Sequence, residues 1–208
     1  MKYHWISKNI IGCHNFLPPL ILQNIKIDLL NSRTKFSVPS WGDKDDKVSQ
    51  LQFYSENCGS FDYWIDQDEF PPETPNITKL GDWFYHRGLE NFIAESDRNS
   101  VFKFLEMKTK KHDIHVCAYN DGGYYGWHMD NLPFFTFNLI LNEGDNLEGG
   151  DMLFMDDGKI IEIPNMNNYM VVFPSYISHS IKIIKSKNGK DVPFPQQRFS
   201  IQYWTKCS

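Results

Sequence analysis

A histidine and an aspartate two residues apart are the first side chains in this sequence that could do chemistry. His128 and Asp130 lie in YNDGGYYGWHMD, the segment from Tyr119 to Asp130. On a β-strand, residues two apart point to the same side, so this imidazole and this carboxylate could reach one metal ion. Alone, such a pair more often marks a surface histidine beside an aspartate, and a metal site needs a further ligand.

A third candidate ligand follows about fifty residues later in the sequence. His179 comes after YMVVFPSYIS, an apolar run typical of a buried strand, and a return strand there could bring its imidazole beside the first pair. Two histidines and one carboxylate leave three adjacent positions of an octahedral ion open, as in non-haem Fe(II) oxygenases. A structural zinc ion would usually have a fourth protein ligand. By itself, His179 is more often an ordinary interior or surface histidine.

The segment RFSIQYW places polar side chains on one face of a predicted strand. Alternation separates Arg198, Ser200, Gln202 and Trp204 on one face from Phe199, Ile201 and Tyr203 on the other. If the first face is interior, the arginine needs a buried anion such as a carboxylate, because an unpaired buried guanidinium is strongly unfavourable. The alternative is an edge strand whose arginine reaches water.

These segments together resemble the Fe(II)/2-oxoglutarate-dependent dioxygenases, in particular the prolyl 4-hydroxylase-like branch. The family pattern Y-x-x-G-x-x-Y-x-x-H-x-D is matched without a gap by Tyr119, Gly122, Tyr125, His128 and Asp130. EGGD resembles the glycine pair before a core strand, VVFPSYISHS resembles the distal-histidine strand, and R-F-S resembles the cosubstrate-binding R-x-S. The resemblance extends from about Asp113 to Trp204. The interval between His179 and Arg198 is longer than is common in the family.

The resemblance implies a role for each candidate residue. Fe(II) would be bound by His128, Asp130 and His179, with 2-oxoglutarate and O2 completing the metal centre. Arg198 would hold the far carboxylate of 2-oxoglutarate, because a planar guanidinium makes two charge-assisted hydrogen bonds to a carboxylate. The other cosubstrate-binding candidates are Ser200, Tyr119, Thr136, Asn138, Ile140 and Trp204. Ascorbate is a candidate reductant.

The implied reaction is hydroxylation of an unactivated C–H bond, and the substrate follows only by analogy. A prolyl residue in a peptide or protein is the first expectation. The alternatives are a 2-oxoglutarate oxygenase acting on a free small molecule, a cupin-like isomerase, and a non-catalytic jelly-roll module that binds carbohydrate or peptide. The aromatic segment Gln52–Pro72 could be a lid that closes on an extended peptide or a packed insertion.

The elements that would position these residues are mostly strands. Seven short β-rich runs from Asp113 onward, separated by Gly and Asn turns, predict an α+β fold: a double-stranded β-helix, or jelly roll, with N-terminal helices packed on one sheet. Helices are predicted over Phe16–Arg33 and about Ile77–Glu95, with Ser100–Met107 as a possible continuation. In FFTFNLILN, Thr136, Asn138 and Ile140 share the pocket face, and Phe135, Phe137, Leu139 and Leu141 face the helices. We expect one domain, with 1–112 helical and lid-like and 113–206 as the jelly-roll core.

Composition limits the partners. The 208 residues carry 21 Lys plus Arg against 26 Asp plus Glu, a net charge of −5, which disfavours nucleic acid or an anionic membrane as a partner. There is no run of 18 apolar residues and no signal-peptide pattern, so a cytoplasmic protein is expected. The four cysteines are far apart, without C-x-x-C, and are interpreted as reduced.

Overall fold

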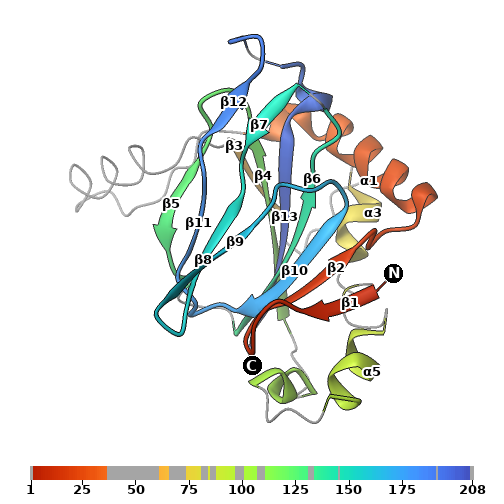
Figure 1. Cartoon of the computed structure of the whole chain (residues 1–208). Helices are drawn as coiled ribbons and strands as arrows, with labels where there is room; N and C mark the ends of the chain where they lie inside the picture. The colour runs from red at the N-terminus through yellow and green to blue at the C-terminus, as the bar shows by residue number, and fades with distance from the viewer. Residues whose placement is uncertain are drawn as a thin grey trace, which may run out of the picture.

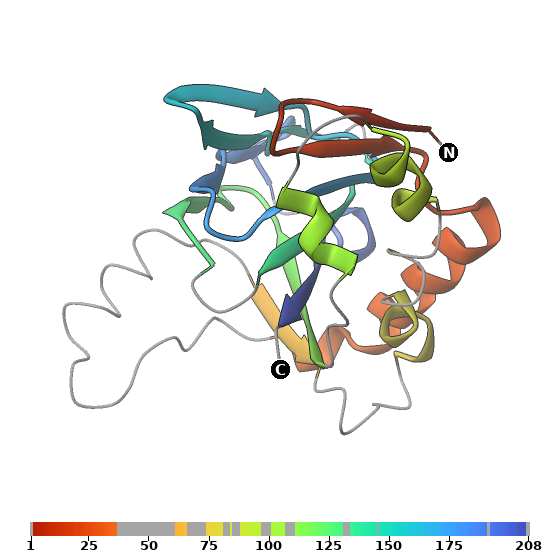
Figure 2. The same cartoon turned by 90° about the horizontal axis from the view of Figure 1, so that it is seen from below.

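The structure is a computed structural model in which two β-sheets face each other and the helices lie on the outer side of the larger sheet (Figures 1 and 2). It describes residues 2–36, 61–65, 74–80, 84, 88–96, 101–106, 111–130, 134–144, 146–190 and 192–206. Among these residues, no helix is long and apolar enough to cross a membrane.

The larger sheet has seven strands and carries most of the polar side chains described below. Its order is β1-β2-β10-β6-β13-β4-β3, and all of its pairings are antiparallel. The strands are β1 Lys2–Trp5, β2 Ile11–His14, β10 Tyr169–Pro174, β6 Phe135–Leu141, β13 Arg198–Lys206, β4 Lys111–Tyr119 and β3 Phe61–Ile65.

The smaller sheet has four antiparallel strands in the order β5-β11-β8-β9. Its members are β5 Tyr125–His128, β11 His179–Ile181, β8 Met152–Asp156 and β9 Lys159–Ile163. Two further strands, β7 Leu147–Gly149 and β12 Ile184–Ser186, pair with each other in antiparallel orientation. The two facing antiparallel sheets form the predicted jelly roll.

Helices cover the outer face of the seven-stranded sheet, as predicted. The helices are α1 Pro19–Asn31, α3 Pro75–Thr78 and α5 Leu89–Ala94, with short 3-10 turns η1 Arg33–Lys35, η2 Val101–Glu106 and η3 Phe194–Gln196. Ile25 and Leu29 of α1 pack in one apolar cluster with outer-face side chains such as Ile201. Asp28, which is also buried, accepts hydrogen bonds from the backbone N–H of Asn76 (2.6 Å) and Ile77 (2.8 Å), and so joins α1 to α3.

Alternation along β6 divides the interior into two cores, as predicted. Phe135, Phe137, Leu139 and Leu141 belong to the cluster that includes the helices. Ile140 belongs to a second cluster between the two sheets, with Phe154 of β8 and Phe173 of β10. The side chains that could do chemistry therefore lie on the face between the sheets.

The predicted turns are present, and two of them need special backbone geometry. Gly149 and Gly150 both have a φ of 75°, and a Cβ on Gly149 would lie 2.3 Å from the carbonyl oxygen of Ile183. Only glycine fits there. At the turn before β10, Asn168 takes the left-handed conformation (φ 54°), and its side chain exchanges two 2.8 Å hydrogen bonds with the backbone of Leu17.

The helix predictions needed correction in their extent. The first helix is shorter than Phe16–Arg33, and the helical region expected over about Ile77–Glu95 is interrupted rather than continuous. Gly88, which precedes α5, has a φ of 90°, a conformation that a continuous α-helix does not contain. The run after Ser100 is a 3-10 helix rather than a continuation of an α-helix.

Four strands were not predicted, and one predicted run is divided. Strands β1, β2, β5 and β7 are short or rich in glycine and polar residues, so they lack an apolar alternation. The run SIKIIK contributes to both β11 and β12. Most of the candidate lid Gln52–Pro72 lies outside the described residues. Its described part, β3, pairs with β4 at the sheet edge, as a packed insertion would.

Candidate metal centre and anion site

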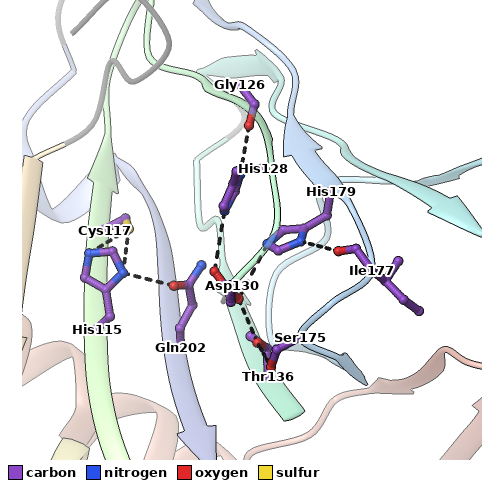
Figure 3. Close-up of polar contacts among 10 residues, drawn as sticks. All are labelled: His115, Cys117, Gly126, His128, Asp130, Thr136, Ser175, Ile177, His179 and Gln202. Carbon is purple, nitrogen blue, oxygen red and sulfur yellow. Dashed lines mark hydrogen bonds and ion pairs between the residues drawn. The ribbon is translucent and has the colours of Figure 1, made fainter. Parts of the chain in front are cut away.

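Strand pairing brings the two candidate histidine ligands together. In the register of β5 and β11, His128 lies opposite His179, and their ring centroids are 4.2 Å apart. Asp130 follows the end of β5, where its backbone N–H donates to the carbonyl of Ser175 (3.0 Å). One ligand atom from each of the three residues lies within 4.8 Å of the others. Figure 3 shows the two rings converging on the carboxylate.

Hydrogen bonds to the backbone determine which nitrogen of each ring faces the centre. Nδ1 of His128 donates to the carbonyl of Gly126, and Nδ1 of His179 donates to the carbonyl of Ile177, both at 2.8 Å. Because a carbonyl can only accept, both Nδ1 atoms carry the proton and both Nε2 atoms present a lone pair. These Nε2 atoms lie 3.7 and 3.8 Å from the two oxygens of Asp130.

Three acceptors therefore converge on one point. Among the described residues, Nε2 of His179 is buried without a hydrogen-bond partner. Lone pairs that face a carboxylate at this distance repel one another, and a cation between them removes the repulsion. The donor set of two imidazoles and one carboxylate suits a divalent transition metal such as Fe(II).

Burial keeps the histidines in the form that binds metal. Burial lowers the pKa of His128 and of His179 from 6.5 to about 4 each, and the charge of His179 lowers that of His128 further. Burial also raises the pKa of Asp130, whereas the neighbouring His128 lowers it. Both imidazoles are neutral at pH 7, so a metal ion displaces no proton from either ring.

Two hydroxyl groups, those of Thr136 and Ser175, lie next to the carboxylate of Asp130. Oγ1 of Thr136 donates to Oδ2 of Asp130 (2.8 Å) and lies 2.9 Å from Oγ of Ser175. Such second-layer hydrogen bonds orient the groups that bind a metal. The sequence placed Thr136 among the residues lining a cosubstrate pocket, and the structure places its hydroxyl on a candidate metal ligand.

The arginine predicted to face inward is fully buried. Nη1 of Arg198 donates to Oγ of Ser200 (2.7 Å), and its Cζ lies 4.9 Å from the ring centroid of Tyr119. Among the described residues, its Nε and Nη2 atoms have no hydrogen-bond partner. Burial lowers the pKa of the guanidinium, but an arginine in a protein stays protonated. A buried cation with two unused donors fits a carboxylate.

The remaining predicted pocket residues also lie on the inner face. Asn138 donates from Nδ2 to Sδ of Met152 (2.9 Å), and its buried Oδ1 has no partner among the described residues. Ile140 is part of the core between the sheets. The ring of Trp204 lies 5.5 Å from that of His115. The inner face thus brings together every candidate named from the sequence.

Sequence reasoning missed His115 and Cys117, and it gave Gln202 no role although it placed that residue on the inner face. All three are buried, and His115 contacts both of the others: its Nδ1 is 3.0 Å from Oε1 of Gln202, and its Nε2 is 3.6 Å from Sγ of Cys117. Alternation along DIHVCAY could have found the two β4 residues, because His115 and Cys117 share a face with Tyr119.

The comparison with protein families agrees with this geometry. The sequence profile of the 2OG-Fe(II) oxygenase superfamily matches residues 114–206, which include all of the candidate metal and anion-site residues. The strand-rich part of this chain is therefore similar to the 2OG-Fe(II) oxygenase superfamily over 93 of its 208 residues. The buried lone pairs and the buried Arg198 fit the iron and the dicarboxylate that the superfamily name implies.

Individual relatives are similar to part of this chain at low identity. A PKHD-type hydroxylase of Synechococcus sp. (strain CC9605) is 28% identical over 96 residues, 41% of this chain and 42% of the relative. A PKHD-type hydroxylase of Rippkaea orientalis is 27% identical over 106 residues, 46% of this chain and 47% of the relative. The chain thus matches less than half the length of these relatives.

Solved structures share the fold over nearly the whole chain. A prolyl-4-hydroxylase of Pseudomonas putida has a TM-score of 0.63 and 17% identity, covering 95% of this chain and 92% of that one. A Trichoplax adhaerens prolyl hydroxylase, solved with a peptide fragment of the hypoxia-inducible factor oxygen degradation domain, has a TM-score of 0.67 and 19% identity. That alignment covers 96% of this chain and 84% of the other.

Proposed function

We propose that this protein is an Fe(II)- and 2-oxoglutarate-dependent dioxygenase that hydroxylates a prolyl residue in a peptide or protein. The observation that carries the proposal is that two polar features occur on the facing sides of the two sheets. One is the triad His128, Asp130 and His179, whose acceptors converge. The other is Arg198, which is buried and has two donor atoms, Nε and Nη2, without a partner among the described residues. A purely structural core has no use for either feature.

The chain's own residues would hold and orient the reactants. When bound, iron and 2-oxoglutarate supply the oxidation: O2 and 2-oxoglutarate are consumed, one oxygen atom enters the substrate C–H bond, and succinate and CO2 are released. His128, Asp130 and His179 would hold the iron, and Thr136 keeps Asp130 in place. Arg198, kept in position by Ser200, would bind the far carboxylate of 2-oxoglutarate.

Exposed apolar side chains on the segments around the triad support a peptide substrate. Among the described residues of these segments, four large hydrophobic side chains are exposed: Trp127 (44%), Met129 (53%), Phe134 (47%) and Tyr176 (61%). Backbone hydrogen bonds join these segments, because Ser175 accepts from the N–H of Asp130 and donates to the carbonyl of Phe134. Exposed apolar groups on the segments that carry a site favour an uncharged, apolar partner such as a proline-containing segment.

Reconstitution with Fe(II) and 2-oxoglutarate in air tests the proposal. We expect succinate formation coupled to a mass increase of one oxygen in proline-containing peptides, and no such increase in matched peptides with alanine in place of proline. His179→Ala is the enzyme control. If succinate forms with free amino acids but with none of the peptides, the substrate is a small molecule and not a peptide. A wild-type chain that binds no 2-oxoglutarate in the presence of Fe(II) would contradict the oxygenase itself.

Three further parts of the proposal rest on the family resemblance and on composition. Ascorbate would serve as reductant, the negative net charge argues against nucleic acid and membranes as partners, and a cytoplasmic location fits reduced thiols. Cys13 and Cys117, the two cysteines within the described residues, are buried. If the rate of succinate formation is the same with and without ascorbate, ascorbate is not the reductant.

A further inference from the structure

Gln202 occupies the inner face between the anion site and the metal centre. Along β13, the inner-face order is Arg198, Ser200, Gln202 and Trp204. In the sheet register, Gln202 lies opposite Asn138 of β6, and Trp204 lies opposite Thr136, whose hydroxyl holds Asp130. Along the inner face of β13, Gln202 is therefore next to Trp204, the residue that lies opposite Thr136. Only Ser200 separates it from Arg198 on this face. A ligand that contacts both the Arg198 guanidinium and the triad therefore lies next to Gln202.

The orientation of the Gln202 carboxamide is determined by His115. Gln202 is 4% exposed and His115 is 1% exposed, and Nδ1 of His115 is 3.0 Å from Oε1 of Gln202. With Oε1 as the acceptor, Nδ1 of His115 is the donor, and the amide nitrogen of Gln202 points away from His115. In Figure 3 the carboxamide lies between His115 and the triad, with its nitrogen on the side of the triad.

The amide nitrogen is a donor in a region crowded with acceptors. Among the described residues, the carboxamide makes its hydrogen bond through Oε1, with His115, which leaves the N–H groups of Nε2 available to a ligand. Asn138, whose buried Oδ1 has no partner in the described part of the chain, lies opposite Gln202 in the register of β6 and β13. In Figure 3 the converging acceptors of the triad lie on the side of the carboxamide nitrogen.

We propose that Gln202 binds the oxo-acid cosubstrate at its metal end, donating an amide N–H to the carboxylate beside the keto group, and that His115 is the residue that positions Gln202. This inference rests on the proposed function. Arg198 holds one end of the dicarboxylate, and Gln202 contacts the other end. The two residues therefore recognise different parts of the same molecule, and ligands that lack one part separate them.

Anaerobic binding titrations test this division. The probes are 2-oxoglutarate and 2-oxopentanoate, which has the same chain length but no far carboxylate, followed by the visible charge-transfer absorption of the Fe(II)–oxo-acid complex. We expect Gln202→Leu to weaken both ligands about 10-fold, as for the loss of one hydrogen bond to a charged group. Arg198→Leu should weaken 2-oxoglutarate alone. Gln23→Leu, at an exposed position of α1, is the matched control and should change neither affinity.

Two further variants keep the test independent of folding and address His115. Gln202→Glu keeps an acceptor for His115 but presents a negative charge instead of an N–H, so it should weaken both ligands at least as much as Gln202→Leu. His115→Phe should weaken both ligands in the wild-type background and add no further loss to Gln202→Leu, because it acts through the same contact. Thermal unfolding of each metal-free variant checks that the fold is retained.

The outcomes separate the inference from the function on which it rests. Wild-type affinities for both ligands in Gln202→Leu and Gln202→Glu would overturn the inference, as would a loss confined to 2-oxoglutarate. An additional loss from His115→Phe in the Gln202→Leu background would overturn the positioning role of His115. If the wild-type protein itself shows no charge-transfer absorption with Fe(II) and 2-oxoglutarate, the proposed function fails first.

Discussion

The two faces of strand β13 differ in chemistry although both are buried. Phe199, Ile201 and Tyr203 lie in the apolar cluster beneath the helices. Arg198 and Ser200, on alternate positions, are equally inaccessible, and Arg198 has donors with no partner in the described structure. One strand thus contributes hydrophobic burial on one side and strongly polar groups on the other.

Neighbouring residues of β13 therefore serve different purposes. Those on the outer face stabilise the fold, and those on the inner face form the proposed site. Burial of apolar surface stabilises the fold, whereas burial of incompletely paired polar groups opposes it. We therefore expect substitutions on the outer face to reduce the free energy of unfolding, and substitutions on the inner face to reduce ligand binding or turnover. The four predictions below test this separation.

The largest effect is expected at the triad. His128→Ala and Asp130→Ala should each abolish succinate formation, because two remaining ligands cannot hold iron in the required arrangement. Neither variant should lower the free energy of unfolding of the metal-free protein appreciably, since each removes one of three mutually repelling acceptors. Succinate release and urea unfolding measure the two effects. Turnover at the wild-type level in either variant would remove that residue from the ligand set.

The next largest effect is expected on the outer face. Phe137 is 1% exposed, and its ring centroid lies 5.4 Å from that of Phe84 and 6.0 Å from that of Tyr203. Phe137→Ala should lower the free energy of unfolding by about 3–5 kcal/mol, as for other large-to-alanine substitutions in cores. Chemical denaturation measures this value, and Phe137→Leu should recover most of it. A loss below about 1 kcal/mol would contradict a well-packed outer core.

An intermediate effect is expected at Arg198. Arg198→Leu should raise the KM for 2-oxoglutarate on the order of 100-fold, because a bound carboxylate loses its charged partner. The free energy of unfolding of the ligand-free variant should be unchanged or higher, since hydrocarbon replaces a buried, incompletely paired guanidinium. Steady-state kinetics and unfolding provide the two measurements. An unchanged KM would place the carboxylate site elsewhere.

The smallest effect is a pH dependence of stability. Burial lowers the pKa of His128 and His179 from 6.5 to about 4, so the unfolded chain binds more protons between these values. The free energy of unfolding of the metal-free protein should therefore fall as the pH decreases from 6.5 to 4. Asp130 acts in the opposite sense, because its raised pKa lets the folded state take up a proton.

Comparison with His179→Leu isolates one contribution to this pH dependence. The variant should show a shallower decrease in the free energy of unfolding over the same interval, measured by urea denaturation at several pH values. Identical slopes in the two proteins would show that His179 titrates normally in the folded state.

Much of the strand-rich half could be predicted because its signals are local. Alternation in FFTFNLILN and RFSIQYW correctly assigned side chains to the outer and inner faces, since residues two apart on a strand share a side. The helical region after Ile77 was less predictable, because a left-handed Gly88 and short helices depend on how that segment packs. Strand β5 was missed because its residues carry no apolar alternation, although it bears His128.

The residue types and the spacing of the motif determined by themselves that His128, Asp130 and His179 were candidates for one site, and that Arg198 and Ser200 would share a face. Only the tertiary structure decided that β5 and β11 pair with His128 opposite His179, that Thr136 supports Asp130, and that His115 orients Gln202. The physical reason is that alternation is a property of one strand, whereas a contact between strands depends on register and burial, to which the whole chain contributes.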